Sequence, residues 1–325
     1  MKNRILSIGE ALIDFIPLES GCEIKDVKSY MPLVGGAPTN VCGAVSKLGG
    51  RSAMITQLGN DPFGEKILEY LKKYNVDTSL IKRTIEANTA LAFVSLKDDG
   101  DREFSFYRKP SADMLMKAED IKEEWFEDAY ALHFCSVDLV ESPMKYAHKK
   151  AIEYAVEKEC IISFDPNIRL PLWKDHEAYK ETIKEFIPYA DILKISDEEL
   201  EFITGYTTIE EAKGILFKGR LKLLIYTKGA EGAEAYTSEG VHALHLSNKV
   251  EAVDTTGAGD GFIGSLLYSL SNDEIVLEQL SKLSKERLEK YLAFSNKFCE
   301  YSVQRHGAID SYVTKNEMIE QVNIW

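Results

Sequence analysis

The stretch Asp254-Thr255-Thr256-Gly257-Ala258-Gly259-Asp260-Gly261 places three glycines within five residues, beside two aspartates. The residues that follow carry apolar side chains at positions 262, 263, 266, 267 and 270. Because this is the spacing of an amphipathic helix, the stretch predicts a glycine turn at a helix N-terminus. Unpaired backbone N–H groups and the positive end of the helix dipole favour an anion there, and glycines let the backbone come close to it.

Asp260 is the informative residue of this turn. A carboxylate repels a bound phosphate unless it takes a proton from a hydroxyl that attacks that phosphate, so the pattern indicates a phosphoryl-transfer site. Plain turn chemistry is the alternative, since glycine-rich turns before helices are common in α/β proteins. The turn does not match the dinucleotide fingerprint G-x-G-x-x-G, and the Walker pattern G-x-x-x-x-G-K-[ST] is absent from the chain. A dehydrogenase and a P-loop NTPase are therefore disfavoured.

The composition is that of an ordinary globular enzyme. The chain has 325 residues, of which 45% are hydrophobic and 28% charged, and it is long enough to bury a large core. Its formal net charge of −14 argues against nucleic acid or an anionic membrane as a partner. We expect no signal peptide, and no segment approaches the ~18 apolar residues of a transmembrane helix.

The five cysteines are scattered, odd in number and without a C-x-x-C pair. This pattern is typical of buried thiols in a reducing compartment, so we expect a cytoplasmic protein with neither a zinc site nor a disulfide framework. The six histidines show no ligand spacing, and we expect His148 and His306 on the surface or in loops.

Short apolar strands alternate with helical patterns through most of the chain. This order predicts an α/β fold with a doubly wound, mostly parallel sheet and helices on both of its faces. The expected strands are Ile5–Ile8, Ala53–Leu58, Tyr130–Phe134, Ile161–Asp165, Ile192–Ile195 and Lys222–Thr227. The expected helices are Pro38–Leu48, Gly64–Tyr74, Pro143–Lys158, Tyr179–Tyr189 and Asp197–Thr204. We expect a single domain over residues 1–325.

Two regions, about 15–34 and 85–109, depart from this alternation of strands and helices. They carry strand-like stretches, among them Ala90–Leu96 and Arg102–Tyr107, which the turn Lys97-Asp98-Asp99-Gly100-Asp101 would join. Because both regions lie between α/β units, they predict a small β-sheet lid inserted into the domain. Two separate edge hairpins are the alternative.

Polar residues near the start of the chain suit a polyol. Asp14 follows the first strand and can accept hydrogen bonds from two hydroxyl groups at once. Gly35-Gly36-Ala37-Pro38-Thr39-Asn40 is a double-glycine turn that opens a helix, with Pro38 near its first position. The glycines would admit a ligand close to the backbone, and Asn40 can both donate and accept. Capping of the helix is the alternative role for Asn40.

Polar residues also follow later strands, where α/β sheets bind ligands. Asp165-Pro166-Asn167-Ile168-Arg169 comes at the end of one strand, and Arg169 suits a phosphate, a carboxylate or a surface ion pair. Ser196 and Glu199 match a capping box, which is a sufficient structural reason for both. Thr227-Lys228-Gly229-Ala230-Glu231-Gly232 would form one wall of a nucleotide site or a plain hairpin.

Taken together, these motifs resemble those of the ribokinase-like (PfkB-type) carbohydrate kinases. The resemblance runs from Asp14 to the loop Arg305-His306-Gly307, and its most specific motifs are Gly35-Gly36-Ala37-x-x-Asn40 and the stretch 254–260. It implies a doubly wound α/β domain with a β lid over the sugar, a requirement for ATP and Mg²⁺, and a K⁺ site. Since related kinases often pair through the lid, it also implies a homodimer.

The resemblance further implies a role for each candidate residue. Catalysis would fall to Asp260 as general base, to an anion hole formed by Gly257, Ala258 and Gly259, and to Arg169. The sugar would be bound by Asp14, Gly35, Gly36, Asn40, Arg108 and Asp165. The nucleotide would be bound by Lys194, Thr227, Gly229, Gly232 and Asn296. Glu199 would hold Mg²⁺ through water, and the K⁺ site would comprise Asp254, Thr256, Ser302, Gly307 and Ser311.

Within the family the chain is most similar to fructokinases, through the segments 102–113 and 165–173. Ser196 stands where the general family pattern N-x-x-E has asparagine, a replacement frequent among fructokinase-like members. We therefore expect ATP-dependent phosphorylation of fructose to fructose 6-phosphate. The alternatives are a ribokinase, a 2-keto-3-deoxygluconate kinase or an aminoimidazole riboside kinase, and, in another class, a non-catalytic sugar or nucleotide sensor. An intact Asp260 speaks against the sensor, which needs no base.

Overall fold

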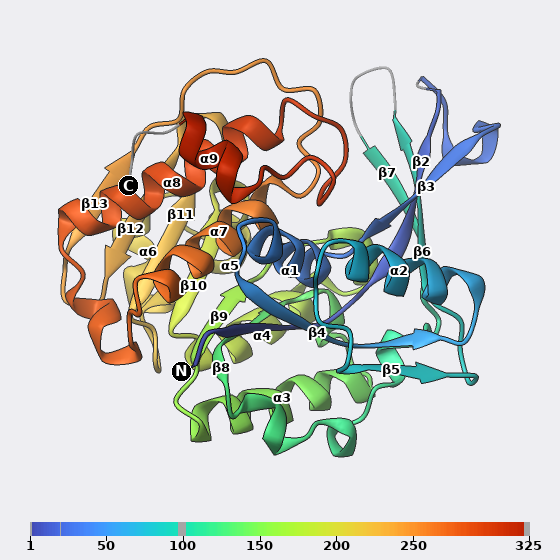
Figure 1. The fold of residues 1–325 in the computed structure, drawn as a ribbon, viewed down its shortest axis with the longest axis horizontal. Coiled ribbons are helices and arrows are strands. Elements are labelled where there is room, and N and C mark those ends of the chain that lie inside the picture. Colours follow the sequence, from blue (N-terminus) through green and yellow to red (C-terminus); the bar gives the residue numbers. More distant parts are fainter. Residues whose placement is uncertain (1, 20, 97–101, 322–325) are drawn as a thin grey trace.

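The structure, a computed structural model, describes residues 2–19, 21–96 and 102–321. Their strands form two sheets, one nine-stranded and one four-stranded, and helices surround the larger one (Figure 1). The larger sheet runs in the order β13-β12-β11-β10-β9-β8-β1-β4-β5. Neighbouring strands from β5 to β11 are parallel, whereas β11, β12 and β13 are joined by antiparallel pairs. The predicted fold class is therefore confirmed.

The inner strands of the large sheet are almost entirely buried, whereas the edge strands β5 and β13 are largely not. They are β1 (Arg4–Ile8), β4 (Arg51–Gly59), β5 (Ile81–Thr84), β8 (Ala129–Cys135), β9 (Ile161–Asp165), β10 (Ile192–Ser196), β11 (Leu223–Thr227), β12 (Ala233–Thr237) and β13 (His242–His245). Successive side chains enter opposite faces, so that Ile5 and Leu6 of β1 belong to different hydrophobic clusters. Both faces are covered, which explains why inner strands such as β8 and β9 are mainly apolar.

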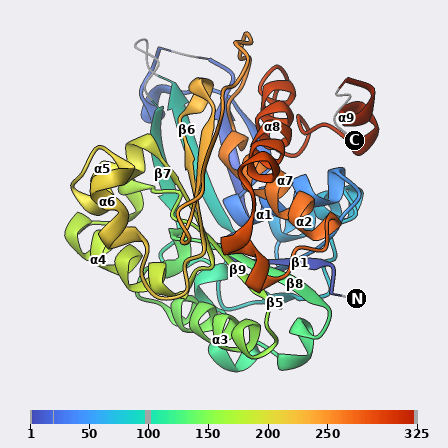
Figure 2. The same ribbon diagram turned by 90° about the vertical axis from the view of Figure 1, so that its left-hand side faces the viewer.

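The helices divide between the two faces of the large sheet (Figure 2). One face is covered by α3 (Pro143–Glu157), α4 (His176–Phe186), α5 (Asp197–Thr204) and α6 (Ile209–Leu216). The other is covered by α1 (Ala37–Lys47), α7 (Ala258–Asn272) and α8 (Lys285–Ser302). The remaining helices are α2 (Pro62–Lys73) and α9 (Lys315–Gln321). Among the described residues, none of the helices combines the length and apolar character needed to cross a membrane.

The four-stranded sheet stands apart from the large one, at the upper right of Figure 1. It consists of β2 (Leu12–Pro17), β3 (Tyr30–Gly35), β6 (Ala90–Leu96) and β7 (Arg102–Tyr107), in the order β3-β2-β6-β7. A parallel pairing of β2 with β6 joins the two predicted regions into one sheet, so they are not separate hairpins. The predicted turn 97–101 lies outside the described residues.

His148 contradicts its predicted position. It lies in α3 with its side chain fully buried, and its ring meets Phe134 edge-on with centroids 6.0 Å apart. Positions 144, 147, 148, 151, 152 and 155 form the buried stripe of this helix, and that helical spacing was the available signal. Burial lowers the pKa of His148 to about 4, so the ring is neutral at physiological pH. His306 is exposed in a loop, as predicted.

Candidate active site

The candidate residues converge where strands of the large sheet end, beside the four-stranded sheet. Asn40 comes from α1, Asp165 from the last position of β9, and Asp260 from the first turn of α7. Carboxyl ends of parallel strands are where α/β folds bind ligands, because loops and helix N-termini meet there. Asp14 projects from β2 of the small sheet, and the charge of Arg169 acts on both Asp14 and Asp260. Both sheets therefore contribute to one site.

Asp260 is held through both of its carboxylate oxygens. Asn40 donates its side-chain amide to Oδ2 at 2.8 Å, and Asn167 donates to Oδ1 at 3.0 Å. All three residues are buried, with Asp260 only 6% exposed. The carboxylate is thereby fixed in orientation, while each oxygen retains capacity for a further hydrogen bond.

Burial is the main influence on the ionisation of Asp260. It raises the pKa of the carboxyl to about 6, since the charged form is poorly solvated. The hydrogen bond from Asn40 lowers the pKa, the nearby Asp165 raises it, and the cations Arg169 and Lys194 lower it. The group is therefore mostly ionised at neutral pH yet basic enough to accept a proton.

The glycine turn caps α7 in the way the sequence predicts. Gly257 is the N-cap and has a φ of +73°, a left-handed conformation that glycine adopts without strain. A Cβ on Gly257 would lie 2.7 Å from the Tyr312 hydroxyl oxygen, so a larger residue would not fit. The Ala258 N–H donates to the Thr255 carbonyl at 3.1 Å. Of the predicted anion-hole amides, that of Ala258 thus has an internal partner.

Lys194 and Asp165 form a buried ion pair beneath the turn. The Lys194 ammonium donates to Asp165 Oδ2 at 2.8 Å, and both side chains are almost inaccessible to solvent. Burial opposes the charge of Lys194, but the carboxylates of Asp165 and Glu199 more than compensate, and the pKa of Lys194 is raised. A Cβ on Gly259 would lie 3.3 Å from the Lys194 ammonium. A fixed positive charge therefore borders the first turn of α7.

Glu199 forms the predicted capping box with Ser196. Its Oε2 accepts the Ser196 N–H at 2.8 Å, and Ser196 Oγ accepts the Glu199 N–H at 3.2 Å. The other oxygen, Oε1, accepts the N–H of Ile168 at 2.8 Å. Glu199 thus ties the loop after β9 to the start of α5, and its carboxylate already has two backbone donors.

Gly35 leaves room for the Asp14 side chain, and Gly36 leaves room for the backbone of Glu10 in the loop between β1 and β2. A Cβ on Gly35 would overlap the Asp14 carboxylate, and a Cβ on Gly36 would lie 2.5 Å from the Glu10 carbonyl oxygen. Gly36 also has a φ of +108°. Burial raises the pKa of Asp14 to about 6, and the charge of Arg169 lowers it. The glycines therefore permit the close approach of the small sheet to the rest of the fold.

Arg108 is buried at the end of β7, where it forms ion pairs with Asp113 and Asp138. Glu10 lies close enough for its charge to act on the guanidinium. Burial raises the pKa of both Glu10 and Asp138. The guanidinium is thus surrounded by carboxylates at the junction of the small sheet with the core.

The residues predicted for the cation loop lie together. Asp254 Oδ1 accepts from the Thr256 N–H at 2.9 Å and from its hydroxyl at 2.6 Å, while Oδ2 accepts the Gly307 N–H at 2.9 Å. Ser302 and Ser311 are buried, but their hydroxyls donate to the carbonyls of Phe298 and Ala308. Asp254 therefore links the glycine turn to the loop 303–311.

The predicted nucleotide wall is a strand–turn–strand unit. Thr227 ends β11, Gly229 and Gly232 adopt φ values of +51° and +110° in the turn, and β12 follows. The Asn296 amide donates to the His245 carbonyl at 2.9 Å and contacts its ring nitrogen at 3.0 Å. Asn296 is buried, so it holds α8 against the end of β13.

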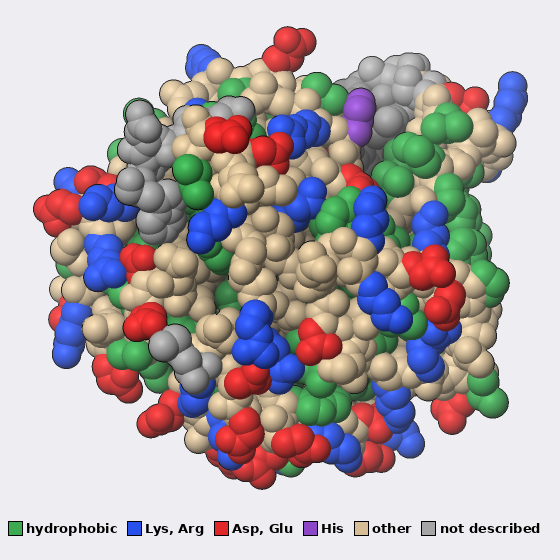
Figure 3. All heavy atoms as spheres, in the orientation of Figure 1, with side chains coloured by type: hydrophobic (Ala, Val, Ile, Leu, Met, Phe, Trp, Pro, Cys, Tyr) green, Lys and Arg blue, Asp and Glu red, His purple; other side chains and the backbone are tan. Residues whose placement is uncertain are grey.

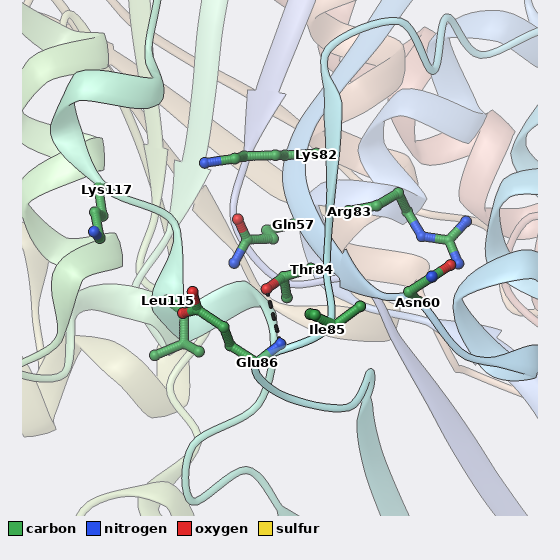
Figure 4. A pocket seen from close by; sticks show the side chains of 9 residues that line it. All are labelled: Gln57, Asn60, Lys82, Arg83, Thr84, Ile85, Glu86, Leu115 and Lys117. Atoms are coloured by element: carbon green, nitrogen blue, oxygen red, sulfur yellow. Dashed lines mark hydrogen bonds between the residues drawn. The ribbon is translucent and has the colours of Figure 1, made fainter.

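A cavity of the structure lies elsewhere. It measures about 420 Å³ and is lined by residues at the ends of β4 and β5 and by two residues that precede α3 in the chain (Figure 4). Its Lys82 pairs with Asp120, and its Arg83 donates to Glu65 at 3.0 Å and to the Gly59 carbonyl at 3.1 Å. None of the predicted site residues lines this cavity.

Asn167 and Tyr312 belong to the site but were not predicted from the sequence. Asn167 contacts Asp260 directly, and the Tyr312 hydroxyl donates to the Gly257 carbonyl at 2.6 Å. The available signal for Asn167 was an asparagine after a proline at a strand end, a residue that tolerates left-handed backbone. No sequence signal pointed to Tyr312, because it lies 55 residues from Gly257, to which its hydroxyl donates.

Comparison with known proteins agrees with this geometry. The family model described as pfkB family carbohydrate kinase matches residues 2–315. The chain is 42% identical over 324 residues to probable fructokinase-2 of Arabidopsis thaliana, covering 99% of this chain and 97% of that protein. A fructokinase of Xylella fastidiosa with bound ATP superposes with a TM-score of 0.90 at 31% identity, over 98% of both chains. A Vibrio cholerae fructokinase with fructose, ADP and potassium ion gives 0.85 and 31%, again over 98% of both chains.

A family model over nearly the whole chain and a relative at 42% identity place the protein in a defined class. The chain belongs to the pfkB family of carbohydrate kinases. It is an ATP-dependent sugar kinase, with a fold shared by solved fructokinases.

Proposed function

We propose that the protein transfers the γ-phosphoryl group of ATP to the primary 6-hydroxyl of fructose. The observation that carries this proposal is the buried Asp260 carboxylate, oriented by two amides at the N-terminus of α7. The relatives and solved structures named above are fructokinases, which supports fructose as the substrate.

The proposed reaction is a displacement at the γ-phosphorus. The sugar hydroxyl oxygen forms a bond to that phosphorus, the bond to the β,γ-bridging oxygen breaks, and ADP leaves with the bond's electron pair. Asp260 accepts the hydroxyl proton, for which a pKa of about 6 is suitable. Backbone amides at the α7 N-terminus, together with Arg169 and Lys194, would stabilise the charge on the transferred group.

The sugar would lie between the two sheets. Asp14 would accept two of its hydroxyls, with Gly35 and Gly36 making room. Asn40 Oδ1 is buried and has no partner among the described residues, so it would accept a third hydroxyl, since an unpaired buried oxygen is costly. Asp165 and Arg108 would also bind the sugar. Each already forms a buried ion pair, and that pair would either stay in place beside the sugar or rearrange when the sugar binds.

The nucleotide would lie along β10–β12, against Lys194, Thr227, Gly229, Gly232 and Asn296. Within the described part of the chain, His, Cys, Asp and Glu form no group of three that could hold a metal. Mg²⁺ therefore fits as an ion carried mainly by ATP and water, with Glu199 as a water-mediated ligand. When bound, it would neutralise charge on the phosphates. We also propose that the loop of Asp254, Thr256, Ser302, Gly307 and Ser311 would hold a K⁺ ion; the solved fructokinase with potassium ion bound supports K⁺ as a ligand, without giving its position here.

The small sheet would act as a lid of a single-domain protein and as a homodimer interface. On one of its faces Phe15 and Phe93 stack at 4.5 Å between centroids, with Tyr30 edge-on to both. On the same face, Tyr107 remains 63% exposed and lies edge-on to Phe93, and apolar side chains collect at the right-hand margin of the surface in Figure 3. A second copy would cover such a face. We further propose cytoplasmic localisation, consistent with five free cysteines.

An ATP-consumption assay across fructose, ribose, glucose, 2-keto-3-deoxygluconate, aminoimidazole riboside and adenosine tests the substrate. We expect the highest kcat/KM for fructose, because sugars that differ by one hydroxyl are separated where buried polar partners would be left unpaired. A higher value for any other sugar reassigns the substrate within the family. ATP turnover with none of them would favour the sensor.

A further inference from the structure

The Asp260 carboxylate accepts hydrogen bonds from residues in two distant parts of the chain. Asn40 lies 220 residues before it on α1, and Asn167 lies 93 residues before it in the loop after β9. Each takes a different oxygen, so the plane of the carboxylate is defined by two bonds. One amide alone would leave the side chain free to rotate about that bond.

The loop that carries Asn167 is itself tightly held. Asn167 has a φ of +45°, and its N–H donates to Asp165 Oδ1 at 3.2 Å. Lys194 holds the other oxygen of Asp165 at 2.8 Å, and Glu199 accepts the next amide, that of Ile168. Asparagine tolerates this left-handed backbone better than most residues. The side chain, 8% exposed, is therefore delivered to Asp260 by a fixed turn.

We propose that Asn167 is a positioning residue for the proton acceptor, which holds Asp260 Oδ1 so that the carboxylate faces the attacking sugar hydroxyl. The inference rests on the proposed role of Asp260 as general base. A residue chosen only for its turn conformation would not need an amide, because glycine adopts a φ of +45° equally well. The bond to Asp260 is thus a separate property of this side chain.

The amide has a second consequence, for the charge of Asp260. A donor to the ionised carboxylate favours that form, so its removal should raise a pKa that burial already sets at about 6. Besides the Asn40 amide, the groups that act on Asp260 or are influenced by its charge include Asp165, Arg169, Lys194, Cys135, Cys299 and Tyr312. Neither substitution below changes any of these six.

Two variants distinguish the effect of the Asn167 side-chain amide from the effect of its left-handed backbone conformation. Asn167→Gly keeps the left-handed backbone and removes the amide. Asn167→Asp keeps the shape and puts a carboxylate against Asp260. We expect kcat to fall about tenfold or more for Asn167→Gly and further for Asn167→Asp, with the KM values for fructose and ATP within about threefold of the parent. The acid limb of the kcat profile should move to higher pH in both.

Asp260→Asn, assayed in parallel, distinguishes failure of the inference from failure of the proposed function. If Asp260→Asn keeps its activity, the proposed base is wrong and the inference falls with it. If that variant is inactive while Asn167→Gly retains the parent kcat and acid limb, only the role of Asn167 is overturned. Circular dichroism checks folding of each variant. A ¹³C-NMR titration of the Asp260 carboxyl, unchanged in whichever Asn167 variant folds, would also overturn it.

Discussion

The hydroxyl of Tyr312 donates to the carbonyl oxygen of Gly257 at 2.6 Å, and so ties the C-terminal loop to the N-cap of α7. Tyr312 is 1% exposed and packs against Phe298. Gly257 has no side chain with which to fix its own conformation, and its carbonyl accepts this bond in addition to the Gly261 N–H at 2.7 Å. The geometry of the glycine turn therefore depends in part on a residue far away in the sequence.

Tyr312→Phe should weaken both stability and turnover. The ring still fills its site, but the Gly257 carbonyl loses a buried donor, a change that costs about 1 kcal/mol. A less fixed turn should also lower kcat by about three- to tenfold, with little change in sugar KM. Thermal unfolding and steady-state kinetics measure the two effects. Tyr301→Phe, on the less buried side of α8, is the control and should match the parent. A kcat equal to the parent's would remove Tyr312 from the support of the turn.

Asp260→Asn should bind ATP and fructose nearly as well as the parent but lose most turnover. Asparagine keeps the size of the side chain but cannot accept the hydroxyl proton, and loss of a general base typically costs about 10²–10⁴ in rate. Calorimetry and kcat on one preparation provide the measurement. Glu181→Gln, which removes an exposed carboxylate on α4, serves as the control. If Asp260 only capped its helix, the variant would lose about 1 kcal/mol of stability and little activity; activity within threefold of the parent would establish that role instead.

Activity should fall as the pH drops through about 6. Burial raises the pKa of Asp260 to about 6 and that of Asp14 to about 6. In the proposed function Asp260 must be ionised to take the hydroxyl proton, and Asp14 must be ionised to accept hydrogen bonds from two sugar hydroxyls. Since these folded-state pKa values lie above the usual value of 3.8, protonation of the two groups stabilises the folded state, and the loss of activity should precede acid unfolding. Rate profiles and far-UV circular dichroism from pH 4.5 to 8 would show the order. A kcat/KM that stays constant across this range would contradict the assignment.

Gly35→Ala should impair sugar binding selectively. The added Cβ would overlap the Asp14 carboxylate and displace it, and loss of a charged hydrogen bond costs about 1.5 kcal/mol or more, so the sugar KM should rise at least about tenfold. Gly214→Ala is the matched control. Its Cβ would meet nothing within 4 Å, and in helix α6 it should stabilise the protein by about 0.5–1 kcal/mol. An unchanged sugar KM in Gly35→Ala would separate Asp14 from substrate binding.

The proposed dimer can be tested by light scattering at micromolar concentration. We expect a mass about twice that of the 36.6 kDa chain. Tyr107→Glu, on edge strand β7 of the small sheet, should shift the population toward monomer, because it places a charge in the apolar contact. Tyr206→Glu, also exposed but remote from the small sheet, should not. A single 36.6 kDa species for the parent would rule out the dimer under these conditions.

The sequence predicted those parts of the fold that depend on local periodicity. The apolar runs of β8 and β9 and the buried stripe of α3 follow directly from side-chain spacing, so strand and helix positions agree to within a few residues. Neither α6 nor β5 was predicted. A central glycine weakens the helical pattern of α6, and two charged residues weaken the strand pattern of β5. The prediction for His148 was wrong because histidine is often exposed, whereas its position on the apolar stripe of α3 buries it.

What the sequence by itself determined was the glycine turn with Asp260 at a helix N-terminus, since backbone conformation and helix dipole are local properties. Only the tertiary structure decided what surrounds that carboxylate. Asn40, Asn167 and Lys194 reach the site from three separate elements of the fold. Their meeting is a product of sheet order and helix packing, which no local pattern encodes. The sequence therefore identified the candidate proton acceptor, and the packing of the chain determined its orientation and its pKa.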